Sequence, residues 1–149
     1  MPAPVDVLRQ VPLFADLNQR QLKRLANDFK DRRFNEGTSI VREGEMSGIG
    51  FFVITDGEAI VEADERVVAT LGPGDHFGEL ALIREGVRTA TVTALTPLTC
   101  LEITFWDFRR AAKDSPDITW KLLQYVTDLL VEERLARARA FAGSVSLTA

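Results

Sequence analysis

The chain has 149 residues, a formal net charge of −4 and a single cysteine, and 46% of its residues are hydrophobic. This length fits one domain, the lone cysteine excludes an internal disulfide, and the acidic balance disfavours general nucleic-acid binding. The N-terminus lacks the regions of a signal peptide, and no run reaches the roughly 18 apolar residues of a membrane span. We therefore expect a cytoplasmic protein without a membrane segment.

The first predicted element is a helix near the N-terminus. Apolar residues recur at spacings of three and four from Leu22 to Phe29, which predicts a helix over about 18–28. Residues 1–29 are therefore interpreted as an N-terminal helical segment.

A β-rich region follows. From residue 30 to residue 103, short runs of β-forming residues are separated by glycines, which is typical of an all-β barrel or jelly roll. Asp56-Gly57 joins the runs 51–54 and 59–61 and predicts a hairpin between them. Cys100 lies in an apolar run, so we expect a buried structural thiol.

Helix returns at the end of the chain. Thr104-Phe105-Trp106-Asp107 matches a capping box and predicts a helix to about Lys113. Ser115-Pro116 places an N-cap before a proline at the first helical position, which predicts a second helix from 116 to about 141. The expected organisation is a single domain over 1–149, with its C-terminal helices in 104–142.

One stretch, residues 77–92, combines groups that suit a small anionic ligand. Gly78 has no Cβ, so the backbone there can approach a ligand closely. Glu79 can accept hydrogen bonds from sugar hydroxyls, and Arg88 offers a planar donor fork that matches a phosphate. The run 80–83 is long enough for one helical turn whose N–H groups would face an anion. The stretch therefore predicts a nucleotide-phosphate pocket.

The same stretch resembles the phosphate-binding cassette of the cyclic-nucleotide-binding domain family, to which catabolite activator proteins and the regulatory subunits of cyclic-AMP-dependent protein kinase belong. The run Phe77-Gly78-Glu79-Leu80-Ala81-Leu82 precedes Arg88-Thr89-Ala90, with the family's spacing of nine between glutamate and arginine. Further matches follow in the family's order at Gly37, Gly44, Phe51-Phe52-Val53-Ile54, Gly57, Leu71-Gly72 and Gly74-Asp75. The resemblance covers roughly residues 10–140.

The resemblance implies a mainly β fold, an eight-stranded antiparallel barrel or jelly roll with an N-terminal helix and C-terminal helices. It implies that Glu79 accepts hydrogen bonds from the ribose 2′-hydroxyl and that Arg88 binds the exocyclic oxygens of the cyclic phosphate. The remaining ligand contacts that it implies are Gly78, Leu80, Ala81, Thr89 and Ala90. A threonine at position 89 does not distinguish adenine from guanine, so the expected ligand is cyclic AMP or cyclic GMP.

The family also covers the base with an apolar lid, usually from the helix after the barrel. Candidates for the lid and the base pocket are Tyr125, Leu129, Leu130, Arg134, Val61 and Leu71. Apolar residues at helical spacing are also typical of core or dimer contacts, and that alternative stays open for the helical candidates.

We expect neither an enzyme nor a metal protein. His76 is the only histidine, whereas a metal-dependent jelly roll needs at least two, and no nucleophile can be placed with Asp75-His76. The first hypothesis is therefore a cyclic-nucleotide sensor that switches an effector protein through its C-terminal helix. The alternative is a barrel that does not bind nucleotide and serves as a dimerisation or docking module.

The end of the given sequence bears on whether the chain binds DNA directly. Only residues 143–149 follow Phe141-Ala142, too few for a helix-turn-helix domain, so we expect no direct DNA binding. The chain either works through a separate partner or is a piece of a longer protein. A homodimer through the last helix, as in catabolite activators, is a further expectation.

Overall fold

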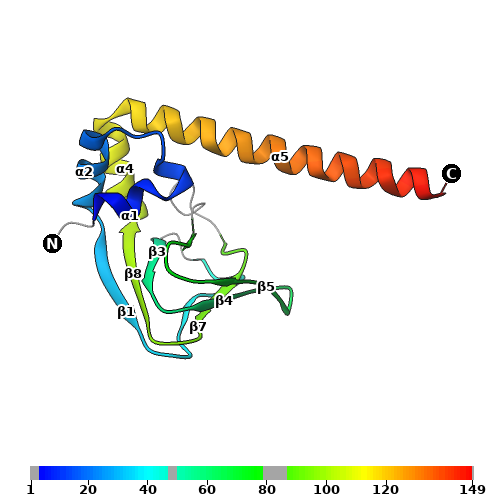
Figure 1. The fold of residues 1–149 in the computed structure, drawn as a ribbon, viewed down its shortest axis with the longest axis horizontal. Coiled ribbons are helices and arrows are strands. Elements are labelled where there is room, and N and C mark those ends of the chain that lie inside the picture. Colours follow the sequence, from blue (N-terminus) through cyan, green and yellow to red (C-terminus); the bar gives the residue numbers. More distant parts are fainter. Residues whose placement is uncertain (1–3, 47–49, 79–86, 149) are drawn as a thin grey trace.

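The computed structural model describes residues 4–46, 50–78 and 87–148, with side chains as far as residue 142 (Figure 1). The N-terminal segment contains α1 (Val5–Arg9), the 3-10 helix η1 (Pro12–Phe14) and α2 (Gln19–Ala26). The strands are β1 (Lys30–Phe34), β2 (Ser39–Val41), β3 (Gly50–Asp56), β4 (Ala59–Ala63), β5 (Arg66–Leu71), β6 (His76–Phe77), β7 (Thr91–Ala94) and β8 (Leu98–Thr104). The helices α4 (Phe105–Asp114) and α5 (Pro116–Thr148) follow.

The described strands form two four-stranded antiparallel sheets, in the orders β1-β8-β3-β6 and β2-β7-β4-β5. The two sheets pack face to face, as in a sandwich. This confirms the predicted mainly β fold with flanking helices, in its jelly-roll form, because the two sheets do not close into one barrel.

The predicted hairpin at Asp56-Gly57 is wrong. β3 pairs with β8 and β6, whereas β4 pairs with β5 and β7, so the chain changes sheets at this turn. Gly57 has a φ of +91°, and a Cβ there would lie 2.3 Å from the carbonyl oxygen of Pro97. The turn is therefore packed against the loop before β8, and the local dipeptide signal could not distinguish that crossing from a hairpin.

Side-chain caps fix where the predicted helices begin. Asn18 and Gln21 form a reciprocal capping box at the start of α2, with bonds of 2.9 and 3.0 Å between side chains and backbone N–H groups. Thr104 Oγ1 accepts a hydrogen bond of 3.1 Å from the backbone N–H of Asp107 and so begins α4, as the sequence predicts. The last helix also begins at Pro116 as predicted, but it continues to Thr148.

The sheet that contains β3 is buried on both faces. On one face lies the outer cluster, which joins this sheet to the N-terminal helices, α4 and the start of α5. Its centre is the group Phe14, Phe29 and Phe51, whose rings meet edge to face at 5.7–6.5 Å between centroids. On the other face lies the inter-sheet cluster, formed by Val41, Phe52, Ile54, Ala59, Phe77, Val92, Ala94, Leu98 and Cys100.

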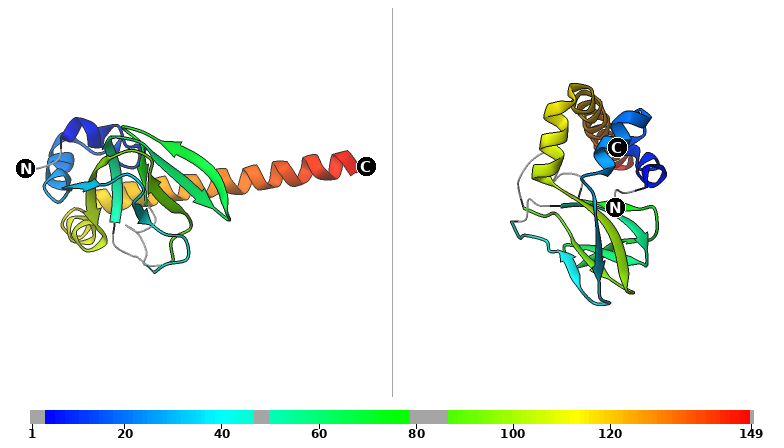
Figure 2. Two further views of the ribbon diagram at one scale, coloured as in Figure 1. Left: turned by 90° about the horizontal axis from the view of Figure 1, so that it is seen from below. Right: turned by 90° about the vertical axis from the view of Figure 1, so that its left-hand side faces the viewer.

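Helix α5 begins within the outer cluster and then projects away from the rest of the molecule (Figures 1 and 2). Ile118 and Leu122 are buried and Tyr125 is half-buried, whereas every side chain from 127 to 142 is exposed. None of the helices among the described residues has both the length and the apolar character that a membrane crossing needs.

Candidate functional site

Arg88 connects the two sheets. Its backbone N–H donates to the carbonyl of Glu45 at 3.0 Å, and its carbonyl accepts from the N–H of Gly44 at 2.9 Å. The loop after β2 therefore fixes the main chain of Arg88, three residues before β7. From this position its Nη2 donates a hydrogen bond of 3.0 Å to the carbonyl of Gly50, the first residue of β3 in the other sheet.

Gly78 lies directly against this guanidinium. Its φ is +88°, in the region that favours glycine, and a Cβ there would lie 2.6 Å from the carbonyl oxygen of Gly50 and 2.9 Å from Nη1 of Arg88. No side chain fits at position 78 unless the arginine or the start of β3 moves. The glycine thus keeps the backbone close to the arginine fork.

The guanidinium of Arg88 is half-buried and incompletely paired. Its Nε is buried and has no hydrogen-bond partner among the described residues. Burial lowers the pKa of Arg88 from its ordinary value, and the carboxylate of Glu102 opposes that shift. An arginine nevertheless stays charged at neutral pH, so this geometry presents a desolvated cation with an unused donor, and an anion would relieve both.

Glu102 compensates Arg88 only from a distance, because it has its own ion pair. Both of its carboxylate oxygens lie 3.2 Å from Nη1 of Arg32. Among the described residues, no carboxylate forms an ion pair with Arg88, so its positive charge is not neutralised within that part of the chain.

The rest of the predicted cassette is only partly described. Thr89 is exposed and Ala90 is half-buried, and both lie between Arg88 and β7. Glu79, Leu80 and Ala81 lie outside the described residues, as does the predicted helical turn over 80–83. Their roles stay predictions.

Of the predicted base contacts, Val61 and Leu71 lie in the sheet that β7 joins. Both are half-buried and pack against the inter-sheet cluster. Val61 pairs with Val92 of β7, four residues after Arg88, so one strand links it to the arginine.

The predicted lid is not assembled in this conformation. Tyr125 packs against the outer cluster, on the face of the β3 sheet opposite to Phe52. Leu129, Leu130 and Arg134 are exposed on the projecting part of α5. The reason is that the apolar first half of α5 docks on the N-terminal helices and α4, which leaves the later residues beyond the body of the molecule (Figure 1).

Sequence reasoning missed Gly50 and Glu102. Gly50 supplies the acceptor that orients Arg88, and a Cβ there would lie 2.9 Å from the ring of Phe52. A glycine at the start of a β-rich run was the only available signal, and it does not identify a partner. Elsewhere, within 4–46, 50–78 and 87–148, no three histidine, cysteine or acidic side chains gather as metal ligands.

The fold is thus a two-sheet jelly roll with flanking helices, and a half-buried arginine connects its two sheets. Residues 31–115 match the cyclic nucleotide-binding domain, and the chain belongs to that family, as its sequence pattern predicts.

Two curated relatives are a regulatory subunit of a protein kinase and a protein kinase. The chain is 37% identical over 132 residues to the cAMP-dependent protein kinase regulatory subunit of Schizosaccharomyces pombe, a match that covers 88% of this chain and 29% of the relative. It is 39% identical over 100 residues to the cGMP-dependent protein kinase of Eimeria tenella, covering 67% of this chain and 10% of that one. The chain thus spans less than a third of the length of either relative.

A solved structure shares the same fold along nearly its whole length. The N-terminal domain of a transcriptional regulator from Streptomyces coelicolor A3(2) superimposes with a TM-score of 0.78 and 32% identity. The match covers 86% of this chain and 94% of that domain.

Proposed function

We propose that this chain binds cyclic AMP or cyclic GMP beside Arg88 and that binding regulates an effector protein. The observation that carries the proposal is the guanidinium of Arg88, which is half-buried, oriented by the Gly50 carbonyl and left with an unpaired Nε among the described residues. Membership of the cyclic nucleotide-binding domain family supports the same ligand class.

The proposed contacts follow from the chemistry of the ligand. The exocyclic oxygens of the cyclic phosphate accept from the arginine fork, and the phosphate charge compensates for the desolvation of the guanidinium. Glu79 accepts from the ribose 2′-hydroxyl, a role that rests on its place in the cassette. Val61 and Leu71 offer apolar surface to the base. The remaining proposed contacts are the cassette residues Gly78, Leu80, Ala81, Thr89 and Ala90.

Regulation requires that the ligand bind one conformation better than another. Tyr125, Leu129 and Arg134 reach the base only if α5 changes its position. At present Lys121 holds the start of α5, because its Nζ donates to the backbone carbonyl of Asp16 and lies 3.5 Å from Oε1 of Gln21. We therefore propose that nucleotide binding shifts the docking of α5. Hydrogen exchange over 118–141 tests this step, and identical protection with and without nucleotide would contradict it.

Calorimetric titration tests the binding itself. Cyclic AMP and then cyclic GMP are titrated into protein that has been unfolded and refolded to remove bound nucleotide. Arg88→Ala should weaken binding by about 2–5 kcal/mol, roughly 30- to 5,000-fold, because a buried phosphate loses its counter-charge. Arg33→Ala is the matched control, since Arg33 is an exposed arginine on β1.

Each result has one meaning. One-site binding that Arg88→Ala weakens and Arg33→Ala preserves supports a cyclic-nucleotide sensor. The nucleotide that binds more tightly shows whether the ligand is cyclic AMP or cyclic GMP, which Thr89 does not determine. Absence of heat with either nucleotide, from refolded wild-type protein with native circular dichroism, would favour a docking module that does not bind nucleotide.

A further inference from the structure

The inter-sheet face of the β3 sheet carries an ion pair as well as apolar side chains. Leu98 and Cys100 of β8 belong to the inter-sheet cluster, and side chains alternate along a strand, so Glu102 lies on that same face. Arg32 of β1 lies on it as well, because Phe34, two residues further on, packs against the inter-sheet cluster. Arg32 and Glu102 form an ion pair at 3.2 Å.

This ion pair lies close to Arg88. A Cβ on Gly50 would lie 3.4 Å from Oε2 of Glu102, and the carbonyl of the same glycine accepts the hydrogen bond from Nη2 of Arg88. Burial lowers the pKa of Arg88, and the carboxylate of Glu102 opposes that shift. The side chain of Glu102 is only 15% exposed, so solvent screens its charge weakly. The carboxylate therefore acts on any anion that binds to Arg88.

The charges of these three side chains suit one kind of phosphate. Arg32 and Arg88 are cations and Glu102 is an anion, so together they carry a single positive charge. A cyclic phosphate is a diester with one negative charge, whereas a nucleoside 5′-monophosphate carries nearly two at about pH 7.5, because its second pKa is about 6. The cyclic phosphate is balanced by these groups. The second charge of a monophosphate would be unbalanced, and Glu102 would repel it.

We propose that Glu102, held in place by Arg32, is a specificity-determining residue that excludes dianionic nucleoside monophosphates from the Arg88 site. This inference rests on the proposed binding of a cyclic nucleotide beside Arg88. Hydrolysis of one ester bond of a cyclic phosphate yields a monophosphate with a second negative charge. Discrimination by charge thus lets the site respond to the cyclic nucleotide and reject its hydrolysis product.

The test measures how the ratio of two dissociation constants changes when Glu102 loses its charge. Cyclic AMP and 5′-AMP, or cyclic GMP and 5′-GMP if guanine is preferred, are titrated calorimetrically into refolded protein at about pH 7.5. Glu102→Gln should reduce the discrimination against the monophosphate about tenfold, because the dianion loses roughly twice the repulsion that the monoanion loses. Charges elsewhere, Glu79 included, are the same in both proteins and cancel in this comparison.

Substitutions of Arg32 separate the effect of charge from that of structure. Arg32→Gln leaves Glu102 uncompensated, so both nucleotides should bind more weakly and the discrimination should increase. The double variant Arg32→Gln, Glu102→Gln carries the wild-type net charge at the site and should show the wild-type ratio, although the ion pair is gone. Glu102→Asp keeps the charge and should keep the ratio. Arg32→Gln carries the test alone if Glu102→Gln does not fold.

A second ligand separates charge from shape. The methyl ester of 5′-AMP is acyclic like 5′-AMP but carries one negative charge like cyclic AMP. Glu102→Gln should therefore tighten the binding of 5′-AMP more than that of the methyl ester. Equal tightening of both would mean that Glu102 acts on the shape of the ligand, and this would contradict the proposal.

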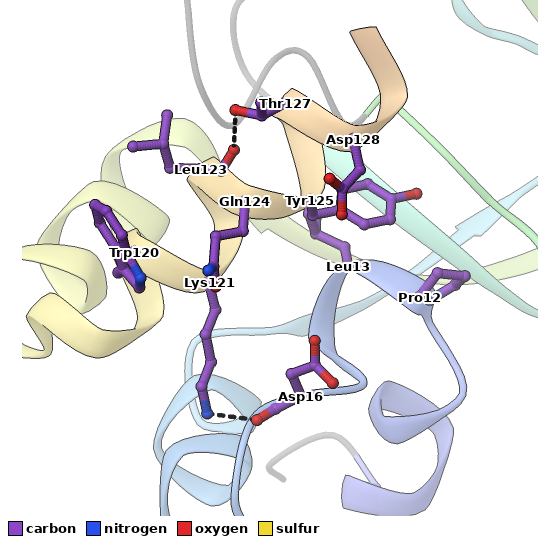
Figure 3. Close-up of a pocket in the computed structure, with 10 residues that line it drawn as sticks. All are labelled: Pro12, Leu13, Asp16, Trp120, Lys121, Leu123, Gln124, Tyr125, Thr127 and Asp128. Carbon is purple, nitrogen blue, oxygen red and sulfur yellow. Dashed lines mark hydrogen bonds between the residues drawn. The ribbon is translucent and has the colours of Figure 1, made fainter. Parts of the chain in front are cut away.

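Asp16→Asn is the matched loss of a negative charge away from Arg88. Figure 3 shows Asp16 in the groove between η1 and α5. Its chain neighbours Phe14 and Leu17 belong to the outer cluster, on the other face of the β3 sheet. This variant should leave the ratio unchanged.

Two further results would overturn the proposal. One is a ratio that is the same in wild type and Glu102→Gln, and the other is a double variant whose ratio stays as low as that of Glu102→Gln. Either result would leave the proposed binding of a cyclic nucleotide intact, because wild type would still bind it. Wild-type protein that binds neither nucleotide would contradict the proposed function, and this inference with it.

Discussion

The two buried clusters lie on opposite faces of the same sheet, yet they differ in what borders them. The outer cluster is enclosed by helices, and three phenylalanine rings pack at its centre. Both clusters are edged by half-buried side chains, such as Tyr125 for the outer cluster and Leu71 for the inter-sheet cluster. The inter-sheet cluster differs in that Arg88, a half-buried cation, connects its two sheets. The outer cluster is bordered by helices, whereas the inter-sheet cluster is bordered by the arginine beside which we propose that the ligand binds.

β3 contributes to both clusters through simple alternation. Phe51 and Val53 point into the outer cluster, while Phe52 and Ile54 point into the inter-sheet cluster. Because side chains alternate along a strand, a change at one residue affects stability and a change at its neighbour affects the ligand-side cluster. The difference between the clusters can therefore be tested one residue at a time.

The largest expected effect is in the outer cluster. Phe14→Ala removes a fully buried ring that contacts Phe29 and Phe51, and should lower the free energy of unfolding by about 3–5 kcal/mol. Urea unfolding measures it, and the affinity of the folded fraction for nucleotide should not change. Phe14→Leu, a smaller loss of volume, serves if the alanine variant does not fold.

Leu71→Ala is the matched change in the inter-sheet cluster. Leu71 is half-buried, so we expect a cost of only about 1 kcal/mol in unfolding, together with weaker nucleotide binding. Equal losses of stability for Leu71→Ala and Phe14→Ala would contradict the difference between a ring at the centre of one cluster and a half-buried side chain at the edge of the other.

Gly78→Ala should have an intermediate effect. The new Cβ would meet the Gly50 carbonyl and Nη1 of Arg88, and φ is +88° there, so we expect a loss of about 1–3 kcal/mol in unfolding. Binding should fall as well, because the arginine fork must move. Gly74→Ala is the control: its φ is +91° but a Cβ there would meet nothing within 4 Å, so it should lose stability without losing affinity.

Local signals predicted the elements and the family of this fold. Capping residues such as Asn18 and Thr104 act on backbone groups three residues away, so the sequence alone indicates where α2 and α4 begin. The cassette spacing from Glu79 to Arg88 is equally local, and it predicted the family that the comparisons confirm.

Contacts between distant residues were not predictable in the same way. Asp56-Gly57 satisfies the rules for a hairpin, yet pairing is decided by β8 and β7, more than thirty residues later. The Gly50 carbonyl pairs with Arg88 across 38 residues, and no local pattern marks a backbone acceptor. The position of Tyr125 depends on which helices cover the β3 sheet. Periodicity predicted that Tyr125 lies on the apolar face of its helix, but not that this face packs against the outer cluster.

The smallest effect concerns Cys100, whose side chain is buried in the inter-sheet cluster. Burial, with help from Glu102 and against Arg32, raises the pKa of this thiol to about 12. In the unfolded chain the thiol ionises near pH 9, so above that pH the unfolded state binds fewer protons and the folded state loses stability. We expect about 1 kcal/mol less stability at pH 10 than at pH 8 from this group. Cys100→Ala lacks the thiol, so its free energy of unfolding does not contain this pH dependence. The difference in free energy of unfolding between wild type and Cys100→Ala, measured with urea, should therefore narrow by that amount from pH 8 to pH 10. A constant difference would mean that the thiol ionises as readily in the folded protein, and that the inter-sheet cluster is open to water even at its centre.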